Sequence, residues 1–152
     1  LIFISPSDMM VLLVHPNHKN EYEMHLSEAK RLVAKGESEK ILSSIQWDFA
    51  MQSARSFINF SFENDNLAIF NYYNPERGFK TIESIKTPIL AISGTKDEAI
   101  VTNQKDSLEL LKSKAKNCPR FEYYIFDGAE HDFEGFEQNI INSVLKFLNI
   151  KI

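Results

Sequence analysis

The sequence predicts an α/β fold in which parallel strands are flanked by helices. Two observations support this class. Three short apolar runs, at residues 1–5, 88–93 and 121–126, are typical of buried strands. Helical patterns follow the second and third runs, so that strand and helix alternate as they do in parallel sheets.

The three expected strands differ in composition. Residues 1–5 and 88–93 are almost continuously apolar, which suits strands that are covered by helices on both faces. Residues 121–126 are rich in aromatic side chains and end at Asp127-Gly128, which is a turn signal. We expect these strands to lie in one parallel sheet.

Two helices are expected in the last third of the chain. The first covers about residues 103–114, where Leu108, Leu111 and Ala115 share one helical face. The second covers about residues 134–148. Its apolar stripe consists of Phe136, Ile140, Ile141, Val144, Phe147 and Leu148.

A mostly helical insertion separates the first two strands. An ordinary crossover needs only a dozen or more residues, whereas residues 7–87 provide about eighty. The expected helices cover residues 20–36, 38–45 and 51–59, the first of them between an Asn20-x-x-Glu23 capping pattern and Gly36. We therefore expect residues 7–87 to form a cap or lid domain, and residues 1–6 with 88–152 to form the core domain.

Composition excludes several classes of protein. A hydrophobic share of 43% and a charged share of 25% are those of a globular domain. The net charge of −4 argues against a generally basic, nucleic-acid-binding surface. No apolar run reaches the ~18 residues of a membrane span, and no signal-peptide pattern is present. The single cysteine, Cys118, fits a reducing compartment. We expect a cytoplasmic protein with no nucleic-acid partner and no membrane span.

Chemically active side chains follow the second and third expected strands. Ligands of open α/β sheets bind at the carboxyl ends of the strands. Asp97 follows the second strand and His131 follows the third, so the two should converge at one edge of the sheet. An aspartate beside an imidazole fixes its tautomer and stabilises its cation, as a Ser-His-Asp hydrolase requires. Asp97 precedes His131, which fits the chain order Ser…Asp…His of that class.

Two motifs resemble those of a known fold. Residues 85–97, Ile-Lys-Thr-Pro-Ile-Leu-Ala-Ile-Ser-Gly-Thr-Lys-Asp, resemble the acid-bearing strand of the α/β-hydrolase fold. Residues 128–133, Gly-Ala-Glu-His-Asp-Phe, resemble its catalytic-histidine loop. Residues 4–9, Ile-Ser-Pro-Ser-Asp-Met, and the helical insertion resemble a branch of bacterial and fungal hydrolases that includes siderophore-ester hydrolases.

The resemblance implies a serine hydrolase that acts on a small-molecule ester, or less readily an amide. His131 would be the general base and then the general acid, and Asp97 would orient it. The resemblance implies neither a metal nor another cofactor, because the triad and an oxyanion hole suffice for acyl transfer.

The sequence departs from the α/β-hydrolase pattern in lacking a recognisable nucleophile. No G-x-S-x-G motif occurs in the 152 residues, and Ser5, Ser7 and Ser93 do not lie in a glycine-flanked turn between strand and helix. In the resembled fold the nucleophile lies upstream of the strand that opens this chain. We therefore expect the chain, which begins at Leu1, to be the C-terminal half of an α/β hydrolase whose N-terminal half supplies the serine.

Other residues have alternative roles. Asp8 and Glu98 are alternative acids, because Asp8 also follows a strand and Glu98 adjoins Asp97. We favour Asp97 as the acid and expect Asp8 to line the site. Aromatic side chains of the cap, Trp47 and Phe49 among them, are expected to provide an apolar wall for the substrate, although most cap aromatics should fill the cap's own core.

A metal site and two other functions are the remaining alternatives. His15, His18 and His25 are irregularly spaced without a cysteine, so we expect surface or loop histidines rather than metal ligands. The alternative function is a non-catalytic binding protein of the same fold. A nucleotide-binding flavodoxin-like domain is disfavoured, because no glycine-rich phosphate loop follows a strand.

Overall fold

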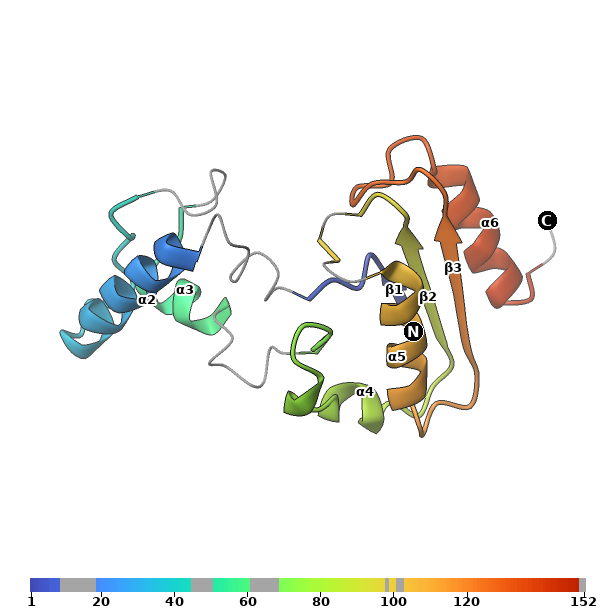
Figure 1. Ribbon diagram of the computed structural model, residues 1–152, viewed down its shortest axis with the longest axis horizontal. Coiled ribbons are helices and arrows are strands. Elements are labelled where there is room, and N and C mark those ends of the chain that lie inside the picture. Colours follow the sequence, from blue (N-terminus) through green and yellow to red (C-terminus); the bar gives the residue numbers. More distant parts are fainter. Residues whose placement is uncertain (9–18, 45–50, 61–68, 98, 101–102, 151–152) are drawn as a thin grey trace. The chain divides into compact units, whose positions relative to one another are not determined.

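The structure is a computed structural model of the 152-residue chain (Figure 1). It describes residues 1–8, 19–44, 51–60, 69–97, 99–100 and 103–150. The chain divides into two compact units, one formed by Leu1–Asp8 with Ile69–Ile152 and the other by Met9–Ala68. Each unit has its own buried core.

The larger unit is built on a parallel sheet of three strands in the order β1-β2-β3. The strands are β1 (Ile2–Ile4), β2 (Ile89–Gly94) and β3 (Phe121–Phe126). Figure 1 shows β2 and β3 side by side, with their arrowheads at the same end of the sheet. The sheet and its helices confirm the predicted α/β class.

Strand β2 is the centre of the sheet, and all six of its residues are buried. Because successive side chains point to opposite faces, Ile89 and Ala91 pack on one side and Leu90 and Ile92 on the other. Burial on both faces is the physical reason for the continuous apolar run in the sequence. Full burial of one such Ile or Leu contributes about 1.5–3 kcal/mol.

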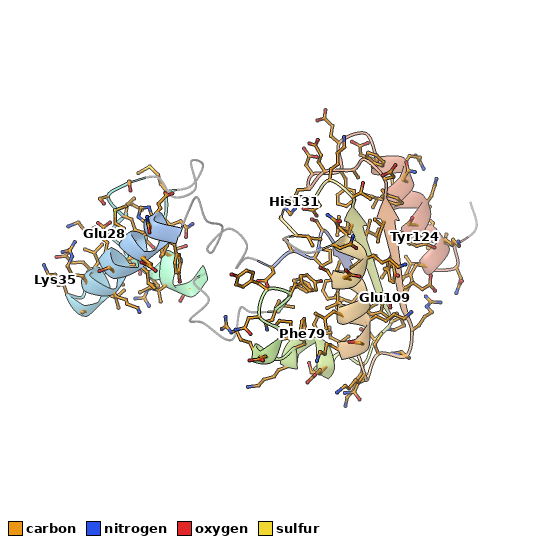
Figure 2. The ribbon with its side chains drawn as sticks, viewed as in Figure 1. Glu28, Lys35, Phe79, Glu109, Tyr124 and His131 are labelled. Atoms are coloured by element: carbon orange, nitrogen blue, oxygen red, sulfur yellow. The ribbon has the colours of Figure 1, made fainter. Side chains whose placement is uncertain are left out.

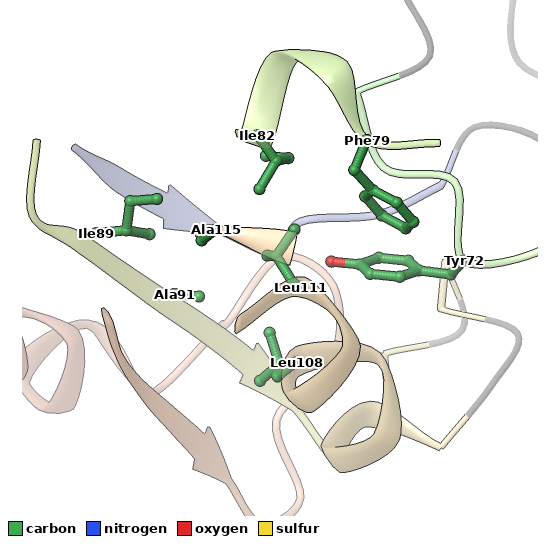
Figure 3. Close-up of a cluster of buried hydrophobic side chains, with 8 residues drawn as sticks. All are labelled: Tyr72, Phe79, Ile82, Ile89, Ala91, Leu108, Leu111 and Ala115. Carbon is green, nitrogen blue, oxygen red and sulfur yellow. The ribbon is translucent and has the colours of Figure 1, made fainter. Parts of the chain in front are cut away.

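Helices cover both faces of the sheet. Helices α4 (Lys80–Ser84) and α5 (Gln104–Lys114) contribute to the first cluster, and α6 (Glu137–Phe147) contributes to the second. Figure 3 shows the first cluster, in which Leu108 and Leu111 of α5 and Ile82 of α4 lie over β2. The η1 turn (Pro75–Arg77) precedes α4.

Local sequence features determine where α5 and α6 begin. The Asn103 side chain accepts hydrogen bonds from the backbone N–H groups of Lys105 and Asp106, which caps the start of α5. Helix α6 begins at Glu137, so the predicted start at residue 134 is wrong. Gly135 has a φ of 80°, a left-handed conformation that a right-handed helix does not contain.

The smaller unit contains α2 (Lys19–Ala34) and α3 (Ala54–Phe60), which pack against each other. Its core consists of Tyr22, Ala29, Leu32, Leu42, Ala54 and Phe57. The helix expected over residues 38–45 is wrong for its described part, residues 38–44. That segment forms turns and an antiparallel bridge between Ile41 and Ser53 instead, a pairing between distant residues that local helical periodicity does not reveal.

His25 is also not where the sequence predicts it. Its side chain lies on α2 and is buried, only 1% exposed, beside Phe57, with its Nε2 atom 3.3 Å from Glu21 Oε1. The expectation of a surface histidine is therefore wrong for this residue. His15 and His18 lie outside the described residues.

The boundary between the units differs from the expected domain boundary at residue 87. Tyr72, Phe79 and Ile82 are buried in the same cluster as Ile89 of β2, so residues 69–87 pack with the sheet (Figure 3). The smaller unit ends at Ala68. Within the described part of the chain, no helix is both long and apolar enough to cross a membrane.

Candidate active site

Three polar side chains meet at the carboxyl end of the parallel sheet. Ser5 directly follows β1, Asp97 follows the end of β2 at Gly94, and His131 lies in the loop after β3. Figure 2 shows His131 at the end of the sheet where the strands terminate. The parallel strands deliver all three residues to one edge, as the sequence predicts for Asp97 and His131.

Asp97 and His131 are hydrogen-bonded to each other. The Nδ1 atom of His131 lies 2.9 Å from Oδ1 of Asp97. The Asp97 side chain is fully buried, whereas that of His131 is 49% exposed. Because an ionised carboxylate only accepts hydrogen bonds, this contact places the ring proton on Nδ1 and leaves a lone pair on Nε2.

The Asp97 carboxylate has further donors. The backbone N–H of Ala99 donates to Oδ1 at 3.0 Å, and the Ser5 hydroxyl donates to Oδ2. Donors of this kind compensate a buried carboxylate for the water that it has lost. The backbone carbonyl of Asp97 accepts from the Gln104 side chain at 3.3 Å, which ties the site to the first turn of α5.

Ser5 touches both members of the pair. Besides its bond to Asp97, its Oγ lies 2.8 Å from His131 Nδ1. Its backbone N–H donates to the carbonyl of Ile92 at 2.8 Å, and its φ is 50°. The sequence predicts no such role for Ser5; the available signal is its place directly after a strand at the edge that also carries Asp97.

The loops after β2 and β3 are joined by hydrogen bonds. The Thr95 hydroxyl donates to Asp127 Oδ1 at 3.1 Å and accepts from the Gly128 N–H at 2.8 Å. The backbone N–H of Lys96 donates to the carbonyl of Ala129 at 2.9 Å. These bonds fix the start of the loop that carries His131 relative to the strand that carries Asp97.

Close backbone approach requires glycine at position 94. A Cβ atom added there would lie 2.1 Å from the carbonyl oxygen of Ala129. Real Cβ atoms do not approach backbone this closely. Gly94 therefore lets the histidine-bearing loop lie directly against the end of β2.

Asp8 is buried, 4% exposed, and binds backbone from a distant segment. Its Oδ2 accepts a hydrogen bond from the backbone N–H of Tyr73 at 2.9 Å. Burial of the Tyr72 phenol raises its pKa, and the nearby Asp8 charge raises it further. Of the candidate acids, Asp97 is the one whose carboxylate contacts the His131 ring. Glu98, another candidate, lies outside the described residues.

Residues 49–143 match the model of the dienelactone hydrolase family. The match covers more than half of the 152 residues and includes both Asp97 and His131. The chain belongs to this family. The dienelactone hydrolase family is a family of hydrolases with the α/β-hydrolase fold, which agrees with the resemblance of residues 85–97 and 128–133 to that fold. No curated protein and no solved structure matches the chain.

Other predicted site residues fall outside what the structure describes. Trp47 and Phe49 lie in residues 45–50, which are not described. Phe49 is the first residue of the match to the dienelactone hydrolase family, whereas Ser5 and Asp8 precede it. Among the described residues, no group of three or more His, Cys, Asp or Glu side chains is arranged to hold a metal ion.

Proposed function

We propose that Asp97 and His131 are the acid and the base of a serine-hydrolase triad that hydrolyses a carboxylic ester. The observation that carries this proposal is the 2.9 Å contact between the buried Asp97 carboxylate and the half-exposed His131 ring. Membership of a hydrolase family supports the same reaction class.

The geometry suits general-base catalysis. With its proton on Nδ1, His131 has a free lone pair on Nε2 to take the proton of an attacking hydroxyl. The imidazolium that results lies against the ionised Asp97 carboxylate, which lowers the free energy of that charge. The same ring then returns the proton to the leaving alcohol.

The nucleophile in this proposal is a serine in an N-terminal half of the protein. The 152 residues contain no G-x-S-x-G motif, so the proposal requires a serine outside them. The position of Ser5 supports this assignment, because its hydroxyl faces Nδ1, the same nitrogen that faces Asp97. A nucleophile must face Nε2 to be deprotonated by the ring.

The substrate in this proposal is a small carboxylic ester. Residues 9–68, as a compact unit separate from the sheet, are the candidate cap. Trp47 and Phe49 would give the substrate an apolar wall, and Asp8 would line the site. The resemblance of residues 4–9 favours the branch that includes siderophore-ester hydrolases. The single cysteine, Cys118, fits a cytoplasmic setting.

A non-catalytic binding protein of the same fold is the second candidate, and the missing G-x-S-x-G motif is the observation that favours it. One experiment separates the two. The full-length protein is assayed with p-nitrophenyl esters and a matched anilide, and is treated with a fluorophosphonate whose attachment site is located by mass spectrometry. Ester turnover with the label on an upstream serine supports the hydrolase. A folded protein that neither turns over esters nor takes the label supports the binding protein.

A further inference from the structure

We propose that Ser5 is a positioning residue whose hydroxyl holds the Asp97–His131 pair in the tautomer that general-base catalysis needs. The inference rests on the proposed function of that pair. It adds a third hydrogen-bonding group to the acid–base pair, supplied by the residue that follows β1, and β1 pairs with β2.

Hydrogen-bond accounting at Asp97 is the first argument. The carboxylate is fully buried, so it depends on donors from the protein. Oδ1 accepts from the Ala99 N–H and from His131, and Oδ2 accepts from the Ser5 hydroxyl. Removal of the Ser5 hydroxyl therefore takes from Oδ2 the donor that the structure shows there.

The direction of the Ser5 hydroxyl proton is the second argument. A serine hydroxyl has a single proton, and in this arrangement that proton points to Asp97 Oδ2. The lone pairs of Oγ then face His131 Nδ1 at 2.8 Å, beside Asp97 Oδ1 at 2.9 Å. Two acceptor oxygens around Nδ1 favour the tautomer with the proton on that nitrogen. In the other tautomer, Nδ1 would carry a lone pair that faces the lone pairs of both oxygens, and this arrangement is repulsive.

The backbone of Ser5 is the third argument. Its N–H continues the ladder between β1 and β2 by donating to Ile92, while its φ of 50° is in the left-handed region that L-residues rarely adopt. A glycine would adopt this conformation more easily but would have no hydroxyl. The presence of serine at a position where the backbone favours glycine points to a use for the side chain.

The test uses four variants of the full-length protein. Ser5→Ala and Ser5→Gly both remove the hydroxyl, Ser5→Cys keeps a weaker donor of similar size, and Ser93→Ala is the matched control. Ser93 lies on β2, and its buried hydroxyl has no hydrogen-bond partner among the described residues. We expect Ser5→Ala and Ser5→Gly to lower kcat by roughly 10- to 100-fold, the effect of one hydrogen bond to a charged group, with little change in KM. Ser5→Cys should be intermediate, and Ser93→Ala should match the parent.

A spectroscopic measurement tests Ser5 without any turnover. In protein labelled with ¹⁵N-histidine, the ring nitrogen shifts of neutral His131 report which nitrogen carries the proton. We expect the Nδ1–H form in the parent and in Ser93→Ala, and a mixture with the Nε2–H form in Ser5→Ala and Ser5→Gly. If the parent hydrolyses no ester, the proposed function fails, but the ¹⁵N shifts still decide whether Ser5 sets the tautomer.

Three results would overturn the inference. The first is an unchanged His131 tautomer in both hydroxyl-free variants. The second is parental kcat in Ser5→Gly with a loss in Ser5→Ala, which would assign Ser5 a role in backbone conformation alone. The third is a fluorophosphonate label on Ser5 itself, which would make Ser5 the nucleophile.

Discussion

Asp97 is fully buried, whereas the His131 ring that it binds is 49% exposed. This difference in exposure suits the two different roles that the proposed function gives to these residues. A buried carboxylate is held in one place because it depends on its hydrogen-bond donors, Ser5 and Ala99 included. An exposed ring can meet a substrate while one of its nitrogens remains fixed. In the proposed triad, Asp97 would therefore be the fixed anchor and His131 the accessible base.

Replacement of His131 by alanine tests the base. Since the side chain is half exposed, His131→Ala should leave the fold nearly intact. Ester turnover in the full-length protein should fall on the order of 10⁴- to 10⁶-fold, the range seen when a triad histidine is lost. Steady-state kinetics with a p-nitrophenyl ester and a circular dichroism spectrum give the two readouts. Exposed Glu130 next to it is the matched control, and Glu130→Ala should keep parental activity. Activity retained in folded His131→Ala would remove the residue from the mechanism.

Asp97 and Asp8 are distinguished by a pair of isosteric changes. In Asp97→Asn the amide favours the wrong histidine tautomer, and a loss of about 10⁴-fold in kcat is expected. In Asp8→Asn the amide oxygen still accepts from the Tyr73 N–H, so the loss should be much smaller. Parallel kcat measurements on the two variants decide the acid. A greater loss in Asp8→Asn would transfer the role of acid from Asp97 to Asp8.

Gly94 tests the contact between the two loops. Gly94→Ala places a methyl group 2.1 Å from the Ala129 carbonyl, so the histidine-bearing loop must move. Overpacking of this kind costs about 1–3 kcal/mol, and the displaced loop should also lower kcat. Urea denaturation gives the free energy of unfolding, and ester kinetics give the second readout. Parental values for both would show that the loop position does not depend on Gly94.

Thr95 tests the hydrogen bonds that hold the same loop. Thr95→Val removes the 2.8 Å acceptor of the Gly128 N–H and the hydroxyl that donates to Asp127, whereas Thr95→Ser keeps both bonds. We expect Thr95→Val to lose about 0.5–1.5 kcal/mol of stability, with a fall in kcat that Thr95→Ser does not show. Thermal unfolding and ester kinetics on the two variants provide the comparison. Equal behaviour of valine and serine would mean that the hydroxyl does not position the loop.

The sheet could be predicted from the sequence because the apolar run of its central strand is uninterrupted and its parallel topology follows from the order of strands and helices. Strand β2 is buried on both faces, so its apolar run is uninterrupted. The meeting of Asp97 and His131 follows from topology, since parallel strands end at the same edge. Neither inference needs any knowledge of how particular side chains pack.

Several errors arise where contacts between distant residues decide the structure. The sequence predicts a helix over residues 38–45, whereas residues 38–44 form turns and a bridge between Ile41 and Ser53. The burial of His25 depends on α3, which brings Phe57 against it from another part of the chain. The contacts of Ser5 likewise depend on the register of β1 with β2. Hydrophobic patterns report which face of an element is buried, but not which hydroxyl reaches which carboxylate.

Strand β1 forms an edge of the described sheet. It pairs with β2, and the side chains of Leu1, Ile2 and Ile4 are 52%, 37% and 50% exposed. An edge strand with exposed apolar side chains is a template for association with another chain. A further strand from an N-terminal half, as the proposed function implies, would cover this edge.

The 152-residue chain by itself is therefore expected to hydrolyse no ester and to associate in solution. Multi-angle light scattering measures the association, and p-nitrophenyl ester assays measure activity. Ile4→Lys places a charge on the exposed edge and should reduce association without creating activity, because edge charges oppose strand pairing. The matched change Ile141→Lys adds a charge at a similarly exposed site on α6, so it should leave the association unaltered. An active monomer of the 152 residues would place the nucleophile within them and overturn the proposal of an upstream serine.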